Sequence, residues 1–119
     1  MQTMTISGRL PAYNELHRLP WQVARATKQA GMDIVMWQAK IAKLEPIEGK
    51  CTVTIACFEP NARRDVDNVT SGAAKIILDA LQQIGILKGD GRKYVDQVIF
   101  PKVEVDRENP RIEVTLENA

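Results

Sequence analysis

The stretch Cys51-Thr-Val-Thr-Ile-Ala-Cys-Phe58 decides the fold, because apolar residues alternate along it with hydroxyl-bearing or small ones. Successive side chains of an extended chain point to opposite faces. Val53 and Ile55 therefore share one face, and Thr52 and Thr54 share the other. β-Branched residues are enriched in strands, so this stretch predicts a β-strand with one apolar face.

Downstream of this strand the apolar period lengthens from two residues to between three and four, which indicates a helix over 68–84. Gly85 follows directly, and glycine commonly closes a helix. We expect the apolar positions of this helix to form its buried face: Val69, Ala73, Ile76, Ile77, Ala80 and Ile84.

Upstream, the pattern predicts a strand over 3–9, a loop over 11–20 and a helix over 20–44. Proline is tolerated in the first turn of a helix, which suits Pro20. The spacing i, i+3, i+7 and i+10 predicts one buried apolar stripe on this helix. Its members are Ile34, Trp37, Ile41 and Leu44.

Two strands are predicted at the C-terminal side, over 94–105 and 111–117, and we expect them to pair as an antiparallel hairpin. Pro101 marks an edge or a bulge in the first of them. The order of elements is then β-α-β-α-β-β. This order predicts an α+β fold in one domain over 1–119, with two helices packed on a four-stranded mixed sheet.

Composition agrees with a globular domain. The chain has 119 residues, of which 45% are hydrophobic and 26% charged, and this length corresponds to one domain. No apolar run reaches the ~20 residues that a membrane helix needs. The first residues lack the apolar core of a signal peptide. We therefore expect a cytoplasmic protein that does not bind membranes.

The cysteines support a reducing compartment. Cys51 and Cys57 lie on one predicted strand, where six residues span about 20 Å, whereas a disulfide allows about 7 Å between Cα atoms. We expect them to remain unpaired. The single histidine, His17, stands in a polar stretch, where a surface position is the expected one.

Charge is distributed unevenly along the chain. Residues 1–44 hold six basic and two acidic groups, a net charge of 6 − 2 = +4, and the remainder holds ten basic and thirteen acidic groups, a net charge of −3. A basic segment can bind a phosphate backbone. A solvated helix face explains the same pattern.

The stretch Arg63-Arg64-Asp65-Val66-Asp67-Asn68 carries the most distinctive chemistry. In an extended backbone Asp65 and Asp67 project to the same side. Two neighbouring carboxylates repel each other unless a positive charge neutralises them, and oxygen ligands suit Mg²⁺. The alternative is that Asp67 or Asn68 caps the helix and Asp65 belongs to a turn.

A third carboxylate, Asp90, lies between two glycines beyond the second helix. If the chain folds back so that Asp90 meets Asp65 and Asp67, the three form a metal site of the phosphodiesterase type. The spacing does not decide this point. The alternative for Asp90 is an ordinary turn residue.

Basic residues complete the candidate site. Arg63 and Arg64 can each hold a phosphate through two hydrogen bonds. Lys75 lies on the polar stripe of the second helix. Its alternative role is an ion pair with Asp79 at i, i+4.

Several of these motifs together resemble the RusA-type Holliday-junction resolvases, small endodeoxyribonucleases often carried by phages and prophages. The resemblance covers nearly the whole chain, including the segment from Leu10-Pro11 to Asn14-Glu15. The motifs that carry it are Arg-Arg-Asp-Val-Asp-Asn (63–68), Lys-Ile-Ile-Leu-Asp-Ala-Leu (75–81), Gly-Ile-Leu (85–87), Asp90 and Lys-Tyr-Val (93–95).

The resemblance implies a nuclease that resolves four-way DNA junctions in DNA recombination and repair by hydrolysing phosphodiester bonds. It implies that Asp65, Asp67 and Asp90 are catalytic carboxylates that bind Mg²⁺. It further implies that Lys75 is the functional lysine and that Arg64 contacts DNA.

The position of the lysine departs from the family pattern. In the better-studied branch the lysine follows the second aspartate by one helical turn less, whereas here the interval is 75 − 67 = 8 residues. Alignment on the following Ile-Leu-Asp-Ala-Leu favours Lys75. Counting from Asp67 favours Ser71.

A junction resolvase of this size is expected to be a homodimer. Resolution takes two nicks in strands of like polarity, and a chain with one carboxylate cluster provides two sites only as two subunits. Exposed apolar positions of the N-terminal helix or of the last strands could supply the interface.

Two other functions fit parts of the sequence. One is a DNA- or RNA-binding module without catalysis, in which the aspartates are structural. The other is an aspartyl phosphatase, but such sites follow an apolar strand directly, whereas Arg63 and Arg64 precede this motif.

Overall fold

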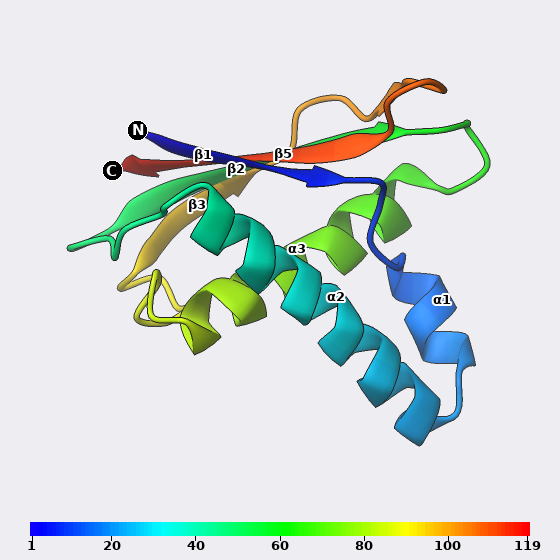
Figure 1. Cartoon of the computed structure of the whole chain (residues 1–119), viewed down its shortest axis with the longest axis horizontal. Helices are drawn as coiled ribbons and strands as arrows, with labels where there is room; N and C mark the ends of the chain where they lie inside the picture. The colour runs from blue at the N-terminus through cyan, green and yellow to red at the C-terminus, as the bar shows by residue number, and fades with distance from the viewer.

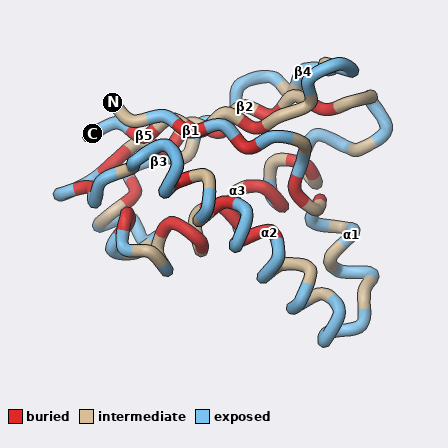
Figure 2. The backbone as a smooth tube through the Cα atoms, in the orientation of Figure 1, coloured by how far each residue is buried: buried red, intermediate tan, exposed pale blue.

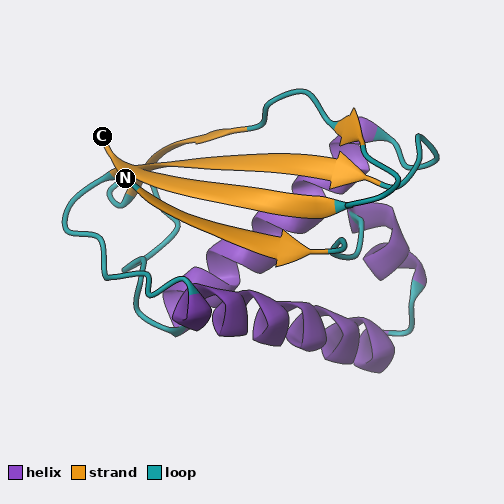
Figure 3. Ribbon diagram, turned by 45° about the horizontal axis from the view of Figure 1, so that its top comes forward, coloured by secondary structure: helices purple, strands orange, loops and turns teal.

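Three helices cover one face of a mixed five-stranded sheet, which confirms the predicted α+β class (Figures 1 and 3). The computed structural model describes all 119 residues. Along the chain the elements are β1 (Gln2–Ser7), α1 (Tyr13–Arg18), α2 (Trp21–Ile41), β2 (Cys51–Glu59), α3 (Val66–Gln83), β3 (Val95–Ile99), β4 (Glu104–Val105) and β5 (Arg111–Asn118). None of the helices is long and apolar enough to cross a membrane.

The strand that the sequence predicts best, β2, lies in the interior of the sheet. The strand order is β1-β5-β2-β3, and the short β4 pairs with the end of β2. β2 runs parallel to β3 and antiparallel to β5, and β1 runs antiparallel to β5. The alternating face of Cys51, Val53, Ile55 and Cys57 is buried, as expected.

The predicted antiparallel hairpin of the last two strands is wrong. β3 and β5 lie on opposite sides of β2 and do not pair. The reason is α3, which crosses over the sheet face and returns the chain parallel to β2, as a helical crossover does. The chain then passes the end of β2, where β4 pairs with Phe58 and Glu59, and reaches the far side as β5.

Local chemistry explains two further differences from the predicted elements. The predicted strand over 94–105 breaks between Ile99 and Glu104, where Pro101 has no N–H to donate to a ladder. The predicted loop over 11–20 contains α1. Its first turn is stabilised by Glu15, whose carboxylate accepts a hydrogen bond of 2.9 Å from the Ala12 N–H.

The buried stripe predicted for the N-terminal helix is also wrong. In α2 the buried residues are Gly31, Met32, Val35 and Ala39. Ile34, Trp37 and Ile41 face solvent with 49%, 64% and 58% of their surface exposed, and Leu44 lies beyond the helix end. α2 has two apolar faces, and the smaller residues pack inward. Figure 2 shows the buried residues gathered between the helices and the sheet.

The prediction for α3 is confirmed apart from its ends: the helix begins two residues earlier and ends at Gln83, and Ile84, predicted on the buried face, is half-buried just after the helix. Ile76, Ile77 and Ala80 are fully buried against the sheet. Gly85 follows the helix with a φ of 79°, which is the left-handed conformation that closes helices. Cys51 and Cys57 are free and buried, as expected, and burial, followed by the nearby Glu59 carboxylate, raises the pKa of the Cys57 thiol to about 11.

The backbone of the segment before α1 packs directly on α3 at Gly72. A Cβ atom on Gly72 would lie 2.3 Å from the Pro11 carbonyl oxygen and 2.8 Å from the Tyr13 nitrogen. Only a residue without a side chain allows this approach. Gly72 therefore sets the distance between α1 and the helix that begins at the candidate site.

We expect Gly72→Ala to destabilise the fold by about 1–3 kcal/mol, the usual cost of overpacking a close contact, although alanine favours a helix by about 1 kcal/mol. Gly31→Ala in α2 is the matched control, because its nearest neighbour is a side-chain methyl of Ile76 at 3.3 Å. Urea unfolding measures both variants. Equal stabilities of the two would contradict a rigid contact at Gly72.

Candidate metal and nucleic-acid site

Asp65 and Asp67 stand exposed at the beginning of α3. Asp65 is the residue that caps the helix, with φ −69° and ψ 142°, yet its carboxylate makes no capping hydrogen bond. Asp67 lies in the first helical turn. Neither carboxylate forms an ion pair within the chain. Both therefore keep their oxygens available to a ligand.

The geometry of the pair differs from the expected one. The helix begins at Val66, so Asp65 is extended while Asp67 is helical. The two-residue alternation of a strand does not relate them. They share instead one end of a helix, where the unpaired N–H groups and the helix dipole favour negative charge.

Asp90 does not join this pair within one subunit. α3 is 18 residues long, about 27 Å at 1.5 Å per residue. Asp90 belongs to the loop between α3 and β3, which leaves the opposite end of this helix (Figure 1). The N–H of Leu87, three residues before Asp90, donates to the Leu81 carbonyl and ties the loop to that end. No group of three or more His, Cys, Asp or Glu side chains that could hold a metal ion occurs in the chain.

A buried ion-pair network holds the segment that precedes Asp65. Glu59 is the one charged residue buried in the fold, with 3% of its surface exposed. Its Oε1 lies 3.4 Å from Arg9 Nη1 and 3.6 Å from Arg64 Nη1. Arg64 also donates to both carboxylate oxygens of Glu15, at 2.5 Å and 3.2 Å, and to the Leu10 carbonyl at 2.9 Å.

These contacts give Arg64 a role within the fold. Arg64 directly precedes Asp65, and its guanidinium ties this point of the chain to α1 and to the end of β2. Only 14% of its side chain is exposed. Its donors are thus directed to protein acceptors. Arg63, by contrast, is exposed and forms no ion pair, and its backbone N–H donates to Asn61 Oδ1 at 3.0 Å.

Sequence reasoning missed Glu59 and Glu15, although a signal for Glu59 was present. The alternation of β2 puts residues 51, 53, 55 and 57 inward, and the next inward position is 59. A carboxylate there needs a positive partner, because burial of an unpaired charge is costly. Glu15 gave no such signal.

Lys75 lies on the exposed side of α3, with 61% of its side chain accessible. Its Nζ lies 3.5 Å from Asp79 Oδ2, so the i, i+4 pair considered from the sequence is present. The same oxygen accepts a 2.6 Å hydrogen bond from Lys28 of α2. Asp79 therefore keeps a cationic partner whether or not Lys75 stays beside it.

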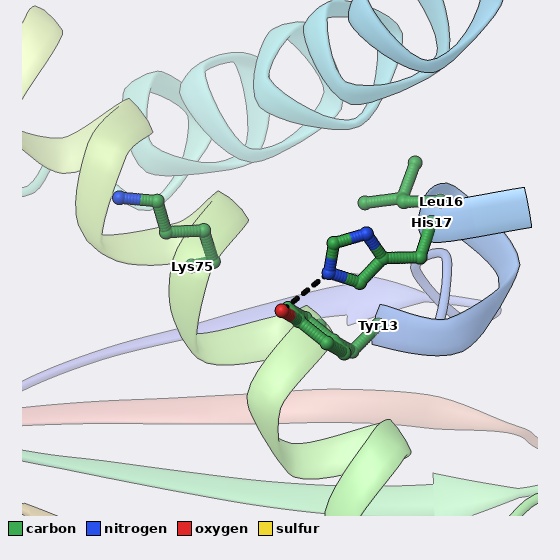
Figure 4. A pocket seen from close by; sticks show the side chains of 5 residues that line it. Tyr13, Leu16, His17 and Lys75 are labelled. Carbon is green, nitrogen blue, oxygen red and sulfur yellow. Dashed lines mark hydrogen bonds between the residues drawn. The ribbon is translucent and has the colours of Figure 1, made fainter. Parts of the chain in front are cut away.

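Lys75 also borders a pocket of about 150 Å³ between α1 and α3 (Figure 4). The other lining residues are Tyr13, Leu16, His17 and Gly72. His17 is exposed, as expected, and its Nε2 hydrogen-bonds the Tyr13 hydroxyl. The pocket is mostly apolar, with cationic or ionisable groups at its rim.

Three exposed residues of α3 form a row that begins at the candidate site. Asp67, Ser71 and Lys75 follow each other at intervals of four residues and are all exposed. Residues four apart lie on one side of a helix, so the row spans about 12 Å along the axis. Lys75 and Ser71, the two residues considered for the lysine position of the resembled family, thus lie on the same side of α3 as Asp67.

No protein-family model matches the chain, and no curated protein matches it. The resemblance of the motif residues to the RusA-type resolvases therefore stays a prediction. The geometry of Asp65, Asp67 and their neighbours is the basis on which a function can be proposed.

The pKa of Glu15 reports on the network. Burial raises it, but the Ala12 N–H and then the hydrogen bond and charge of Arg64 lower it by more, so the pKa lies below its ordinary value. Glu15 therefore stabilises the fold fully at pH values above the ordinary glutamate pKa. This stabilisation is lost as the pH falls through the lowered pKa that Glu15 has in the folded protein.

We expect Arg64→Ala to raise the pKa of Glu15, because the variant removes a bound positive charge. A carboxyl NMR titration of Glu15 measures the change. Arg63→Ala is the matched control, since Arg63 has no ionic partner, and it should leave the pKa unchanged. An unchanged Glu15 pKa in Arg64→Ala would disprove the contact.

Proposed function

We propose that the chain is a magnesium-dependent endodeoxyribonuclease that resolves four-way DNA junctions in recombination and repair. The observation that supports it most directly is the pair of exposed, unpaired carboxylates, Asp65 and Asp67, at the start of α3. A preferred capping residue whose carboxylate does not cap is free for another ligand. The network around Arg64 fixes the backbone that carries this pair.

The two carboxylates fit magnesium. Mg²⁺ is usually held by one or two carboxylates together with substrate phosphates and several waters. When bound, the ion would bind the scissile phosphate, activate a water and stabilise the leaving oxygen. Asp65 and Asp67 would hold it at the start of α3, where DNA can approach because both residues are exposed.

The basic residues then have separate roles. Arg63, exposed beside the carboxylates, is available to hold a neighbouring phosphate. Lys75 Nζ lies beside Asp79, one turn further from Asp67; with its side chain turned toward the start of α3, it would stabilise charge that develops on the phosphate. Arg64, which the sequence resemblance assigned to DNA, acts instead as a positioning residue for Asp65.

Asp90 takes part in this proposal only through a second subunit. Its loop lies beyond the end of α3 opposite to Asp65, so within one chain it cannot complete the pair. A homodimer, which two nicks in one junction require, offers the Asp90 of one subunit to the carboxylates of the other.

The Asp67→Asn variant should abolish cleavage and leave junction binding intact or slightly tighter. The substitution keeps the size of the side chain but removes the charge that holds the metal, whereas binding rests on Lys and Arg and falls as salt rises. Cleavage of a four-way junction in magnesium and filter binding measure the two properties. Near-normal cleavage would show that the carboxylate assignment is wrong.

Mixed dimers test the role of Asp90. If Asp90 acts across the dimer, a mixture of inactive Asp67→Asn and inactive Asp90→Asn subunits regains one intact site and nicks one strand. If Asp90 acts within its own subunit, the mixture stays inactive. Activity of Asp90→Asn alone would remove Asp90 from the site.

Lys75→Ala should lower the single-turnover rate by about two orders of magnitude, as loss of one preorganised donor does, with little effect on binding. Asp79→Ala is the control, because it removes the ion-pair partner and keeps the lysine. If Lys75→Ala cleaves normally and Ser71→Ala does not, the family position belongs to Ser71.

The second candidate function is nucleic-acid binding without catalysis. The distance between Asp90 and the carboxylate pair within one subunit favours it. A thermal-shift titration with magnesium separates the two, because a ligand that binds the folded state raises its stability. A magnesium-dependent shift that Asp67→Asn abolishes supports the nuclease.

A further inference from the structure

The pocket between α1 and α3 is the one cavity of the molecule, and the proposed metal site touches it only at Lys75. A cavity of its volume, about 150 Å³, holds one benzene-sized ring, whereas pockets for drug-sized ligands measure roughly 300–1,000 Å³. The lining is mostly apolar, so a strongly hydrated ion such as free phosphate gains little by entering it. We call this space, lined by Tyr13, Leu16, His17, Gly72 and Lys75, the ring pocket.

Two aromatic rings form one wall of the ring pocket. Tyr13 and His17 lie one turn apart on α1, and their ring planes meet at 83° with the centroids 4.4 Å apart. The hydrogen bond between His17 Nε2 and the Tyr13 hydroxyl holds both rings in this arrangement (Figure 4). A flat ring that stacks on one of them meets the edge of the other, and these are the two favoured geometries of aromatic pairs.

The other wall of the ring pocket is α3 at Gly72. The segment before α1 touches this helix directly, because a Cβ atom at Gly72 would lie only 2.8 Å from the Tyr13 nitrogen. This contact fixes the separation of α1 and α3, so the pocket is open before a ligand arrives. A pre-formed pocket loses less conformational entropy on binding than one that the ligand must order.

The charges around the ring pocket indicate its ligand. Lys75 lies at its edge, and Arg18, exposed at the end of α1, forms no ion pair within the chain. The carboxylate of α1, Glu15, is bound by Arg64. An apolar, ring-sized pocket with cations beside it is complementary to a nucleotide, which joins a flat base to an anionic phosphate. Sites for single-stranded nucleic acids combine these two features.

The ring pocket lies within reach of a strand bound at the candidate metal site. Gly72 follows Asp67 by five residues, about 7.5 Å along the axis of α3. A stacked DNA strand advances about 3.4 Å per nucleotide, so the pocket lies about two nucleotides from the carboxylates. Lys75 belongs both to the row that begins at Asp67 and to the edge of the pocket.

We propose that the ring pocket receives one unpaired base of the DNA strand near the bond to be cut. The base stacks on the ring of Tyr13 or His17, and the phosphate beside it lies against Lys75. Removing a base from its stack costs least where pairing is already weakened, and the branch point of a junction is such a place. The inference rests on the proposed function, which brings DNA to the start of α3.

Two single strands of equal length test the ring pocket without metal and without cleavage. One is oligothymidylate, and the other is the same backbone without bases. Both carry the same phosphates, so the electrostatic part of their binding is the same. We expect oligothymidylate to bind about tenfold more tightly, which is the usual gain from stacking a base on an aromatic ring. Fluorescence anisotropy measures both affinities, and equal affinities would overturn the proposal.

Tyr13→Ala should remove most of the preference for oligothymidylate and leave binding of the abasic strand unchanged, because it removes a stacking surface but no charge. His17→Ala, at another exposed position, should act in the same way. Trp37→Ala is the matched control, since Trp37 is also an exposed aromatic residue, with 64% of its surface accessible, but does not line the pocket. Circular dichroism checks the fold of each variant. A preference that survives in the folded pocket variants would overturn the proposal.

NMR identifies the occupant at the ring pocket itself. Thymidine 5′-monophosphate should shift the signals of the Leu16 methyl groups and the His17 ring and leave the Trp37 indole signal in place. N-acetylphenylalaninamide has a ring but no phosphate. Shifts caused by this compound, and none by the nucleotide, would assign the pocket to a side chain of a protein partner and overturn the proposal.

The outcome for the ring pocket is separate from the outcome for the nuclease. A base preference that Tyr13→Ala abolishes, in a protein that cuts no junction, would leave the ring pocket standing and reject the proposed function. Junction cleavage by a protein without any base preference would do the reverse.

Discussion

The burial of the Glu59 carboxylate is the constraint around which this end of the molecule is arranged. The inward alternation of β2 carries the side chain into the protein, where a lone charge is unstable and must be paired. Arg9 comes from the chain after β1, and Arg64 comes from the chain before α3. The same Arg64 binds Glu15 of α1. Two parts of the chain about 50 residues apart, one with Arg9 and Glu15 and the other with Glu59 and Arg64, therefore meet at one point, and that point lies next to Asp65. The exposed carboxylates stand on a backbone that the interior of the protein holds in place.

The parts of the fold that depend on local pattern could be predicted from the sequence. β2 and α3 each have a single apolar face, so the spacing of their apolar residues along the sequence correctly indicates which side chains are buried. α2 has two apolar faces, and periodicity alone does not say which one meets the sheet; the stripe of Ile34, Trp37 and Ile41 is real but faces outward. Strand pairing was out of reach for a different reason. Whether β5 pairs with β3 or with β2 depends on the path of residues 100–110, and no local rule fixes that path.

The candidate site shows the same division. The pattern Asp65-Val66-Asp67 could be found in the sequence, and both side chains are accessible. Their placement on either side of the first residue of α3 could not, because the helix begins at Val66 and not at Asn68 as predicted. Asp90 illustrates how little a sequence interval says about distance in space: the 18 residues of α3 lie between it and Asp65, so the two residues are held at opposite ends of one helix. Arg64 was expected to contact DNA, whereas in the structure its hydrogen-bond partners come from a segment about 50 residues earlier, which no local pattern indicates.

The position of β5 has a consequence for how the chain acquires its structure. β1 pairs only with β5, with Gln2 opposite Leu116 and Ser7 opposite Arg111. During synthesis the first strand must therefore wait, with its apolar side chains unsheltered, until more than a hundred residues later its neighbour leaves the ribosome. Pairings of such long sequence separation slow folding, because the entropy of closing the loop is lost before contacts compensate for it. The helices and the β2–α3–β3 unit can form earlier, so the sheet closes last along the seam where the two ends of the chain lie side by side (Figure 1).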